Sequence, residues 1–223
     1  VPSVRIVAPI PGKSVAGIEV PNEEREDIVI KDVIERTQDK AAQMKLPVVL
    51  GKDAEGRPVV EDLSRMPHLL IGGATSMGKS VLVNSILSAL LFRFNPDQLR
   101  LIIVDPKLVE FKIYEDIPHL LLPIVNDAND ASQALKWAVA ETKRRYVEMQ
   151  KHSAKNLEAY NAKMKELRAT DAEGDHEGFP FIAIIVDELA ELMLTAKRDV
   201  EQSIVRLTQL ARAAGIHLIM ATQ

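Results

Sequence analysis

Short apolar runs alternate along the chain with longer segments in which apolar residues recur every three or four positions. Residues 99–104, 181–186 and 216–221 form three such runs, interrupted only by Arg100 and His217. Strands that are covered by helices on both faces have this composition, and they occur mostly in parallel sheets. The alternation predicts an α/β fold with a parallel-rich, doubly wound sheet.

The segments between these runs have helical periodicity. We predict helices at residues 81–91, 131–150, 156–167 and 200–214. Pro96 follows the first, and Gly215 suits the position just after the last. Trp137 is expected in the core, and the last helix is expected to turn Val205, Leu207, Leu210 and Ala211 inward.

The first 45 residues have a different character. Residues 4–8, 16–20 and 27–30 are short β-like runs, and residues 32–42 have helical composition. We expect a small α/β domain over residues 1–45, placed before the main domain at 46–223. Residues 46–51 and 58–60 flank a turn, and this hairpin is expected at an antiparallel edge of the main sheet.

The first candidate site follows the apolar run at residues 68–71. Residues 73–80 fit G-x-x-x-x-G-K-[ST], the phosphate-binding P-loop. Lys79 can reach the β- and γ-phosphates of a nucleotide, and the Ser80 hydroxyl can ligate Mg²⁺. The expected cofactors are therefore ATP and Mg²⁺. The expected nucleotide-binding residues are Gly73, Ala74, Thr75, Ser76, Met77, Gly78, Lys79, Ser80 and Val81.

A second candidate site lies where the run at 181–186 ends in Asp187 and Glu188. In P-loop enzymes such a strand is the Walker B element. Asp187 can hold the hydrated Mg²⁺, and Glu188 can orient and deprotonate the attacking water. Acidic residues also suit a helix start. The P-loop makes the catalytic interpretation the stronger one.

Other strand ends carry polar residues too. Asp105 follows the run at 99–104, and Lys107 and Glu110 either face the nucleotide or form a surface ion pair. Gln223 follows the last run, where it either senses the γ-phosphate or simply ends the strand. The basic run 143–145 either touches phosphate or an acidic partner, or is a solvated face.

The composition excludes further kinds of chemistry and of site. The net charge is -4, and the absence of cysteine excludes disulfides, thiolate catalysis and zinc bound by cysteine. No run is long enough to span a membrane, so the chain is expected to be soluble. The acidic loop 171–178 is a weak candidate for a metal site. The chain begins without Met and stops just after an apolar run, which suggests a fragment.

These features together predict a Mg-dependent ATPase with a RecA-like P-loop NTPase core. The absence of an Asn-Lys-x-Asp element argues against a GTPase, and the absence of Leu-Ser-Gly-Gly-Gln argues against a transporter cassette.

Short segments spread over nearly the whole chain carry a resemblance to a known family. They lie at 10–13, 50–53, 66–70, 78–81, 104–107, 114–121, 141–146, 156–157 with 160–161, 186–188, and 211–218 with 221–223. In these segments the chain resembles the motor of the FtsK/SpoIIIE family of DNA translocases. Ser76 and Met77 depart from the small residues usual in the family's P-loop, and neither change removes a phosphate ligand.

The resemblance implies a homo-hexameric ring that pulls double-stranded DNA through its centre in chromosome segregation and cell division. Lys79, Ser80, Asp187 and Glu188 would act as described above, and Arg212 would be an arginine finger that reaches the neighbouring subunit's ATP. Arg212 also suits a plain helix C-terminus. The full-length protein would be anchored at the cytoplasmic face of the bacterial inner membrane, with a site-specific recombinase as a possible partner.

Three alternatives to a chromosome translocase remain. Relatives of the family energise protein secretion or transfer DNA in conjugation, and a nucleotide-binding scaffold without hydrolysis is the third. The segments at 105–107 and 117–121 favour the chromosome translocase, and the intact Lys79 and Glu188 argue against a scaffold.

Overall fold

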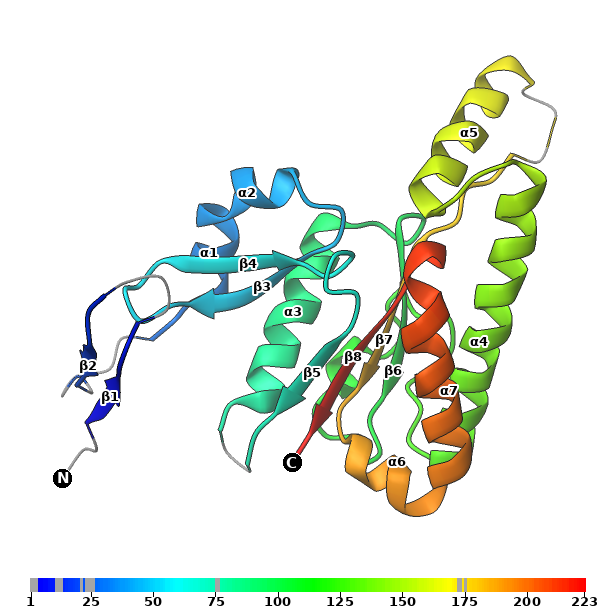
Figure 1. The fold of residues 1–223 in the computed structure, drawn as a ribbon. Coiled ribbons are helices and arrows are strands. Elements are labelled where there is room, and N and C mark those ends of the chain that lie inside the picture. The colour runs from blue at the N-terminus through cyan, green and yellow to red at the C-terminus, as the bar shows by residue number, and fades with distance from the viewer. Residues whose placement is uncertain are drawn as a thin grey trace.

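A four-stranded parallel sheet forms the centre of the computed structural model, which describes residues 4–10, 14–20, 22, 27–74, 77–171, 174 and 176–223. The strands lie in the order β5-β8-β7-β6 (Figure 1). Their bounds are Leu69–Gly72 for β5, Ile216–Thr222 for β8, Phe181–Val186 for β7 and Leu99–Val104 for β6. All three pairings are parallel, so the carboxyl ends of the strands meet at one edge.

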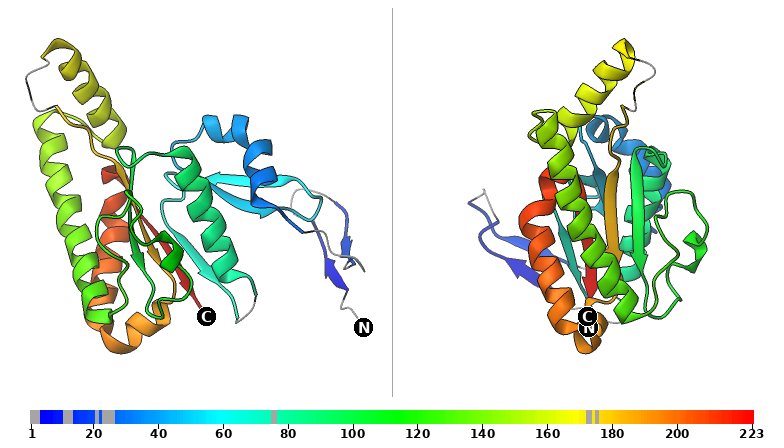
Figure 2. Two further views of the ribbon diagram at one scale, coloured as in Figure 1. Left: turned by 180° about the vertical axis from the view of Figure 1, so that it is seen from behind. Right: turned by 90° about the vertical axis from the view of Figure 1, so that its right-hand side faces the viewer.

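Helices cover both faces of this sheet (Figure 2). Helix α3 (Lys79–Arg93) packs on one face. On the other lie α4 (Ala128–Lys151), α6 (Leu189–Thr195) and α7 (Lys197–Leu210). Alternate residues of one strand enter opposite cores: Ile102 faces α4, whereas Ile103 faces α3. The doubly wound arrangement predicted from the apolar runs is confirmed.

The predicted hairpin exists, but its expected place at the edge of the main sheet is wrong. Strands β3 (Pro47–Lys52) and β4 (Pro58–Asp62) form a separate antiparallel pair. The reason is that both faces of this pair are needed for packing. Val48 enters the core under α3, while Val49 and Val60 pack against the helices that precede the hairpin.

Those preceding helices are α1 (Ile30–Arg36) and α2 (Gln38–Ala42). The strand expected at 27–30 is wrong, because Ile30 instead begins α1, where Ile30, Val33 and Ile34 pack together at helical spacing. The β-like runs at 4–8 and 16–20 form strands β1 (Arg5–Val7) and β2 (Gly17–Glu19), which pair with each other antiparallel. The domain boundary near residue 45 stays a prediction.

Two predictions about buried faces need correction. Trp137 is 42% exposed, because α4 buries the stripe that contains Leu135, Ala138 and Val139 instead. In the last predicted helix, Leu207 and Ala211 are buried as expected, but the expectation is wrong for Val205 and Leu210, which are 47% and 43% exposed. Both helices lie on the sheet through a stripe narrower than the periodicity suggested.

The remaining elements connect these layers. Helix α5 (Leu157–Thr170) extends away from the sheet (Figure 1). The short helices η1 (Lys112–Tyr114) and η2 (Ala211–Ala214) each precede a turn. Among the described residues, no helix is both long and apolar enough to cross a membrane. Of the acidic loop, residues 172, 173 and 175 lie outside the described residues, as do 11–13 of the segment at 10–13.

Candidate nucleotide-binding site

The loop between β5 and α3 presents the start of a helix at the carboxyl edge of the sheet. Gly78 has φ 83°, a left-handed conformation that disfavours residues with a Cβ, and α3 begins directly after it at Lys79. The first turn of α3 has no acidic residue and no side-chain cap. Its free N–H groups and positive dipole end therefore suit a phosphate. Of the predicted loop ligands, Thr75 and Ser76 lie outside the described residues.

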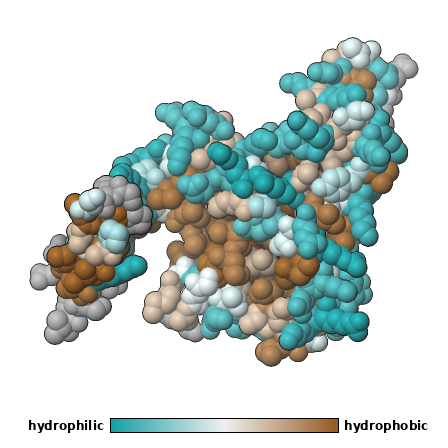
Figure 3. Space-filling model, in the orientation of Figure 1, coloured by the Kyte–Doolittle hydropathy of each residue, from teal (hydrophilic) through white to brown (hydrophobic). Residues whose placement is uncertain are grey.

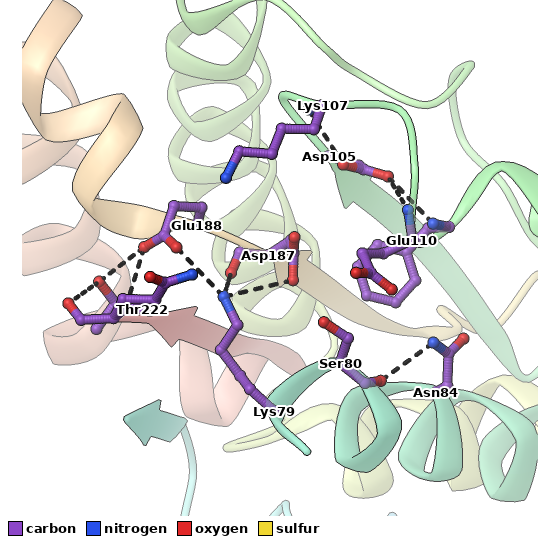
Figure 4. A network of polar contacts seen from close by, with 11 residues as sticks. Lys79, Ser80, Asn84, Asp105, Lys107, Glu110, Asp187, Glu188 and Thr222 are labelled. Atoms are coloured by element: carbon purple, nitrogen blue, oxygen red, sulfur yellow. Dashed lines mark hydrogen bonds and ion pairs between the residues drawn. The ribbon is translucent and has the colours of Figure 1, made fainter. Parts of the chain in front are cut away.

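Lys79 is held by the two carboxylate residues at the end of β7 (Figure 4). Its ammonium donates to the Asp187 carbonyl oxygen at 2.8 Å and to Glu188 Oε2 at 3.3 Å. Asp187 Oδ1 lies 3.7 Å from the same nitrogen. The structure thus brings together the two motifs that lie more than a hundred residues apart in sequence.

Asp187 has a buried carboxylate oxygen that could bind a cation. Its side chain is buried, yet Oδ1 has no hydrogen-bond partner. Burial raises its pKa despite nearby Lys79, and the charges of Asp105, Glu110 and Glu188 raise it further. A buried acceptor in surplus negative charge fits Mg²⁺, which uses one or two carboxylates together with substrate phosphates. Within the described ranges, no group of three or more acidic, His or Cys residues could alone hold a metal.

Glu188 is fixed by donors from two directions. Oε1 accepts from the Thr222 hydroxyl at 3.0 Å and from the Gln223 N–H at 3.2 Å, while Oε2 accepts from Lys79. Burial would raise the pKa of Glu188, but these hydrogen bonds outweigh it and lower that pKa. Sequence reasoning missed Thr222. Its position at the tip of the strand beside β7 was the only available signal.

The loop after β6 approaches the same edge. Asp105 is fully buried and accepts the backbone N–H groups of Lys107, Glu110 and Phe111. The Lys107 side chain extends toward the side of the site where Glu188 lies (Figure 4). Among the described residues, no ion pair joins Lys107 to Glu110, and the charge of Glu110 instead contributes to the raised pKa of Asp187.

The loop is tied to α3 as well. Tyr114 in η1 donates its hydroxyl to Asn84 Oδ1 at 2.9 Å, and the Asn84 amide donates to the Ser80 carbonyl at 3.1 Å. Ser80, the expected Mg²⁺ ligand, therefore sits in a turn that is braced by a segment more than thirty residues away in sequence.

Arg212 is the predicted site residue that the structure does not bring to this edge. It lies in η2, before β8 begins, and its Nε donates to the Ser64 carbonyl at 3.2 Å. It lines a cleft of about 550 Å³ together with Arg65, Lys155 and Asn156. The length of β8 at about 3.3 Å per residue puts it roughly 20 Å from Lys79.

A P-loop at the end of one parallel strand, facing an Asp-Glu pair at the end of another, defines a P-loop NTPase with a RecA-like core. The family model described as "FtsK/SpoIIIE family" matches residues 29–223. The chain belongs to this family.

Proteins named "DNA translocase FtsK" are close relatives. That of Campylobacter jejuni strain 81-176 is 52% identical over 221 residues, which cover 99% of this chain and 23% of that protein. "DNA translocase FtsK 1" of Neisseria meningitidis strain MC58 is 46% identical and matches 99% of this chain and 29% of that protein. The chain thus spans about a quarter of the length of these relatives.

Solved structures share the fold. The cytoplasmic domain of the Thermomonospora curvata type VII secretion ATPase EccC matches with a TM-score of 0.66 and 29% identity, over 80% of this chain and 21% of that one. The pCW3 conjugation coupling protein TcpA, solved with ATPγS, matches with a TM-score of 0.65 and 24% identity, over 99% of this chain and 58% of that one.

Proposed function

We propose that this chain is the ATP-hydrolysing part of a motor that moves double-stranded DNA. The observation that carries the proposal is the cluster of Lys79, Asp187 and Glu188 at the carboxyl edge of the sheet, beside the open start of α3. The relatives named as DNA translocases supply the substrate. Chromosome segregation and cell division are the task that we propose for the full-length protein, on the family resemblance.

In this proposal each residue of the cluster has one role. Lys79 leaves the carboxylates and binds the β- and γ-phosphates, and the N–H groups of the loop and of the first turn of α3 bind the same phosphates. Ser80 and Asp187 would hold Mg²⁺, which neutralises phosphate charge when bound. Glu188 orients the attacking water and takes its proton. Gln223 lies beside Glu188 and contacts the same water or the γ-phosphate.

Arg212 would act on the ATP of a neighbouring subunit in a homo-hexameric ring. Its side chain is exposed and lies at the opposite end of the sheet from Lys79 of the same chain. An arginine so placed can neutralise transition-state charge only in trans. A membrane anchor at the cytoplasmic face of the inner membrane and a recombinase partner would belong to other parts of the full-length protein, and both stay predictions.

A protein-secretion ATPase is the second candidate, because EccC shares the fold at 29% identity. Steady-state ATPase of the full-length protein, with and without long double-stranded DNA, separates the two. We expect strong stimulation that weakens with salt, since a motor that tracks phosphates releases counterions on binding. The Lys79→Ala variant is the blank. Turnover that is indifferent to DNA would contradict the proposal and favour a polypeptide substrate.

A further inference from the structure

Thr222 contacts both halves of the candidate site. Its hydroxyl donates to Glu188 Oε1 at 3.0 Å, and its carbonyl oxygen accepts the N–H of Gly73, the first P-loop residue, at 3.2 Å. Gly72 also pairs with Thr222 in the parallel ladder between β5 and β8. One residue at the tip of β8 therefore lies between the phosphate-binding loop and the expected general base (Figure 4).

The two oxygens of Glu188 point to different sides. Oε2 faces Lys79, and a P-loop lysine marks the side where the terminal phosphates bind. Oε1 faces the end of β8, where the Thr222 hydroxyl and the Gln223 N–H reach it. When Lys79 turns to the phosphates, Oε2 loses its donor and becomes free to accept a proton, whereas Oε1 keeps both of its donors.

Among the described residues, one alternative acceptor lies near the Thr222 hydroxyl. The Gln223 carbonyl oxygen lies 3.4 Å from Thr222 Oγ1, longer than the 3.0 Å to Glu188. A hydrogen bond to an ionised carboxylate is roughly twice as strong as one to a neutral carbonyl. Both distance and charge therefore direct the single hydroxyl proton to Glu188.

We propose that Thr222 is a positioning residue for hydrolysis, whose hydroxyl holds Glu188 so that Oε2 faces the attacking water. This rests on the proposed ATPase function. In the step, the water oxygen bonds to the γ-phosphorus as the bond from that phosphorus to the bridging oxygen of ADP breaks. The water proton moves to Glu188 Oε2 and later passes to solvent.

The backbone and the hydroxyl of Thr222 have separable tasks. The contacts with β5 and Gly73 use the backbone alone, so Thr222→Val keeps them, along with the shape and the β-branching of the side chain. It removes only the hydroxyl. Thr222→Ser keeps the hydroxyl and removes a methyl group, which makes it the matched control.

The test measures kcat and KM for ATP, together with equilibrium binding of ATPγS, in the full-length protein. We expect Thr222→Val to lower kcat about 10- to 100-fold, the size of effect that misplacement of a catalytic group by about 1 Å produces. KM and ATPγS affinity should stay within about twofold, and Thr222→Ser should recover most of kcat. On a Glu188→Gln background, Thr222→Val should add little, because residues that act as a unit are not additive.

Several results would overturn the inference. One is a kcat of Thr222→Val that is unchanged or raised. Another is equal loss in Thr222→Val and Thr222→Ser, and a third is a parallel loss of ATPγS binding, which would indicate a structural role. Failure of the proposed function would give a different result. The unmodified protein would then not hydrolyse ATP, or Lys79→Ala and Glu188→Gln would hydrolyse it as fast as the unmodified protein does.

Discussion

The two ends of the central sheet both bury charged side chains, but among the described residues only the carboxyl end leaves a buried carboxylate oxygen without a hydrogen-bond partner. At the carboxyl end, Lys79 faces two carboxylates, and Asp187 Oδ1 has no hydrogen-bond partner. At the amino end, Arg145 on α4 is only 2% exposed, and its guanidinium bonds Glu141, the Pro180 carbonyl and the Ala214 carbonyl at 2.7 to 2.9 Å. A satisfied buried charge fixes the fold, whereas surplus negative charge with an unused acceptor leaves a place for a cation and a ligand.

Arg145 also shows that a basic run in the sequence can contain a buried structural residue. The run 143–145 was expected either to touch phosphate or an acidic partner, or to be solvated. Arg145 does neither, because it joins α4 to the segments that enter β7 and β8, and its guanidinium lies 5.1 Å from the centre of the Phe179 ring. Its neighbour Arg144 lies 4.9 Å from the same ring, but its side chain is 54% exposed.

Removal of the cation at the unsatisfied end should have the largest effect. Lys79→Ala removes the only lysine that contacts both Asp187 and Glu188 among the described residues. We expect ATP turnover to fall to background, because the terminal phosphates lose their cation and the carboxylates repel them. Steady-state phosphate release measures this. Turnover near that of the unmodified protein would contradict the P-loop assignment.

Glu188→Gln should separate binding from chemistry at the same end. The amide keeps the size of the side chain but cannot take the proton of water, so hydrolysis should slow at least about a hundredfold. ATP binding should persist, as measured by equilibrium titration with labelled nucleotide. Near-normal hydrolysis would rule out Glu188 as the base.

Arg145→Met probes the satisfied buried charge at the amino end, where the effect should be on stability. It leaves Glu141 without its buried partner and two carbonyls without donors, so we expect a loss of about 3–5 kcal/mol in the free energy of unfolding. Denaturant unfolding followed by circular dichroism measures it. Arg144→Met is the matched control, and it should cost no more than about 1 kcal/mol because the Arg144 side chain is 54% exposed. Equal losses of unfolding free energy in the two variants would contradict the claim that Arg145, and not Arg144, is a buried structural charge.

His217, whose buried Nε2 has no hydrogen-bond partner, gives the amino end a pH dependence of smaller size. Burial lowers the pKa of His217 to about 4, below the usual 6.5, although its Nδ1 contacts the Pro67 carbonyl oxygen. The unfolded chain therefore binds the proton more readily. Stability is fully present above about pH 6.5 and is lost as the pH falls toward 4, by about 3 kcal/mol at most.

Unfolding free energies measured from pH 7 to 4 test this dependence against His217→Gln, which should show a correspondingly shallower slope. His68 contributes in the same direction, because burial lowers its pKa as well, so it is left unchanged in both proteins. Identical slopes would show that His217 is not buried in its neutral form.

The sequence predicted the features that depend on local pattern. Residues 99–104 and 181–186 form strands as expected, because a dense apolar run has few ways to be buried in a domain of this size. Lys79, Asp187 and Glu188 meet because motifs at the ends of parallel strands share one edge.

Features that depend on contacts between distant segments could not be predicted. The hairpin at 46–60 would have the same sequence pattern whether it extended the sheet or packed between helices. Its position depends on packing against α1 and α3, which the local pattern does not contain. Thr222 is chemically ordinary until β8 is placed beside β7. The burial of Arg145 depends on carbonyl groups 35 and 69 residues away.

The placement of Arg212 at the amino end, about 20 Å from Lys79 of its own chain, is the central claim for an assembled motor. Mixing Arg212→Ala with Glu188→Gln subunits of the full-length protein and measuring ATPase across ratios tests it directly. Each variant alone should be nearly inactive. We expect mixtures to recover activity, because an intact Arg212 from one subunit can meet an intact Glu188 site in the next. Failure to recover activity at any ratio would contradict an action between subunits.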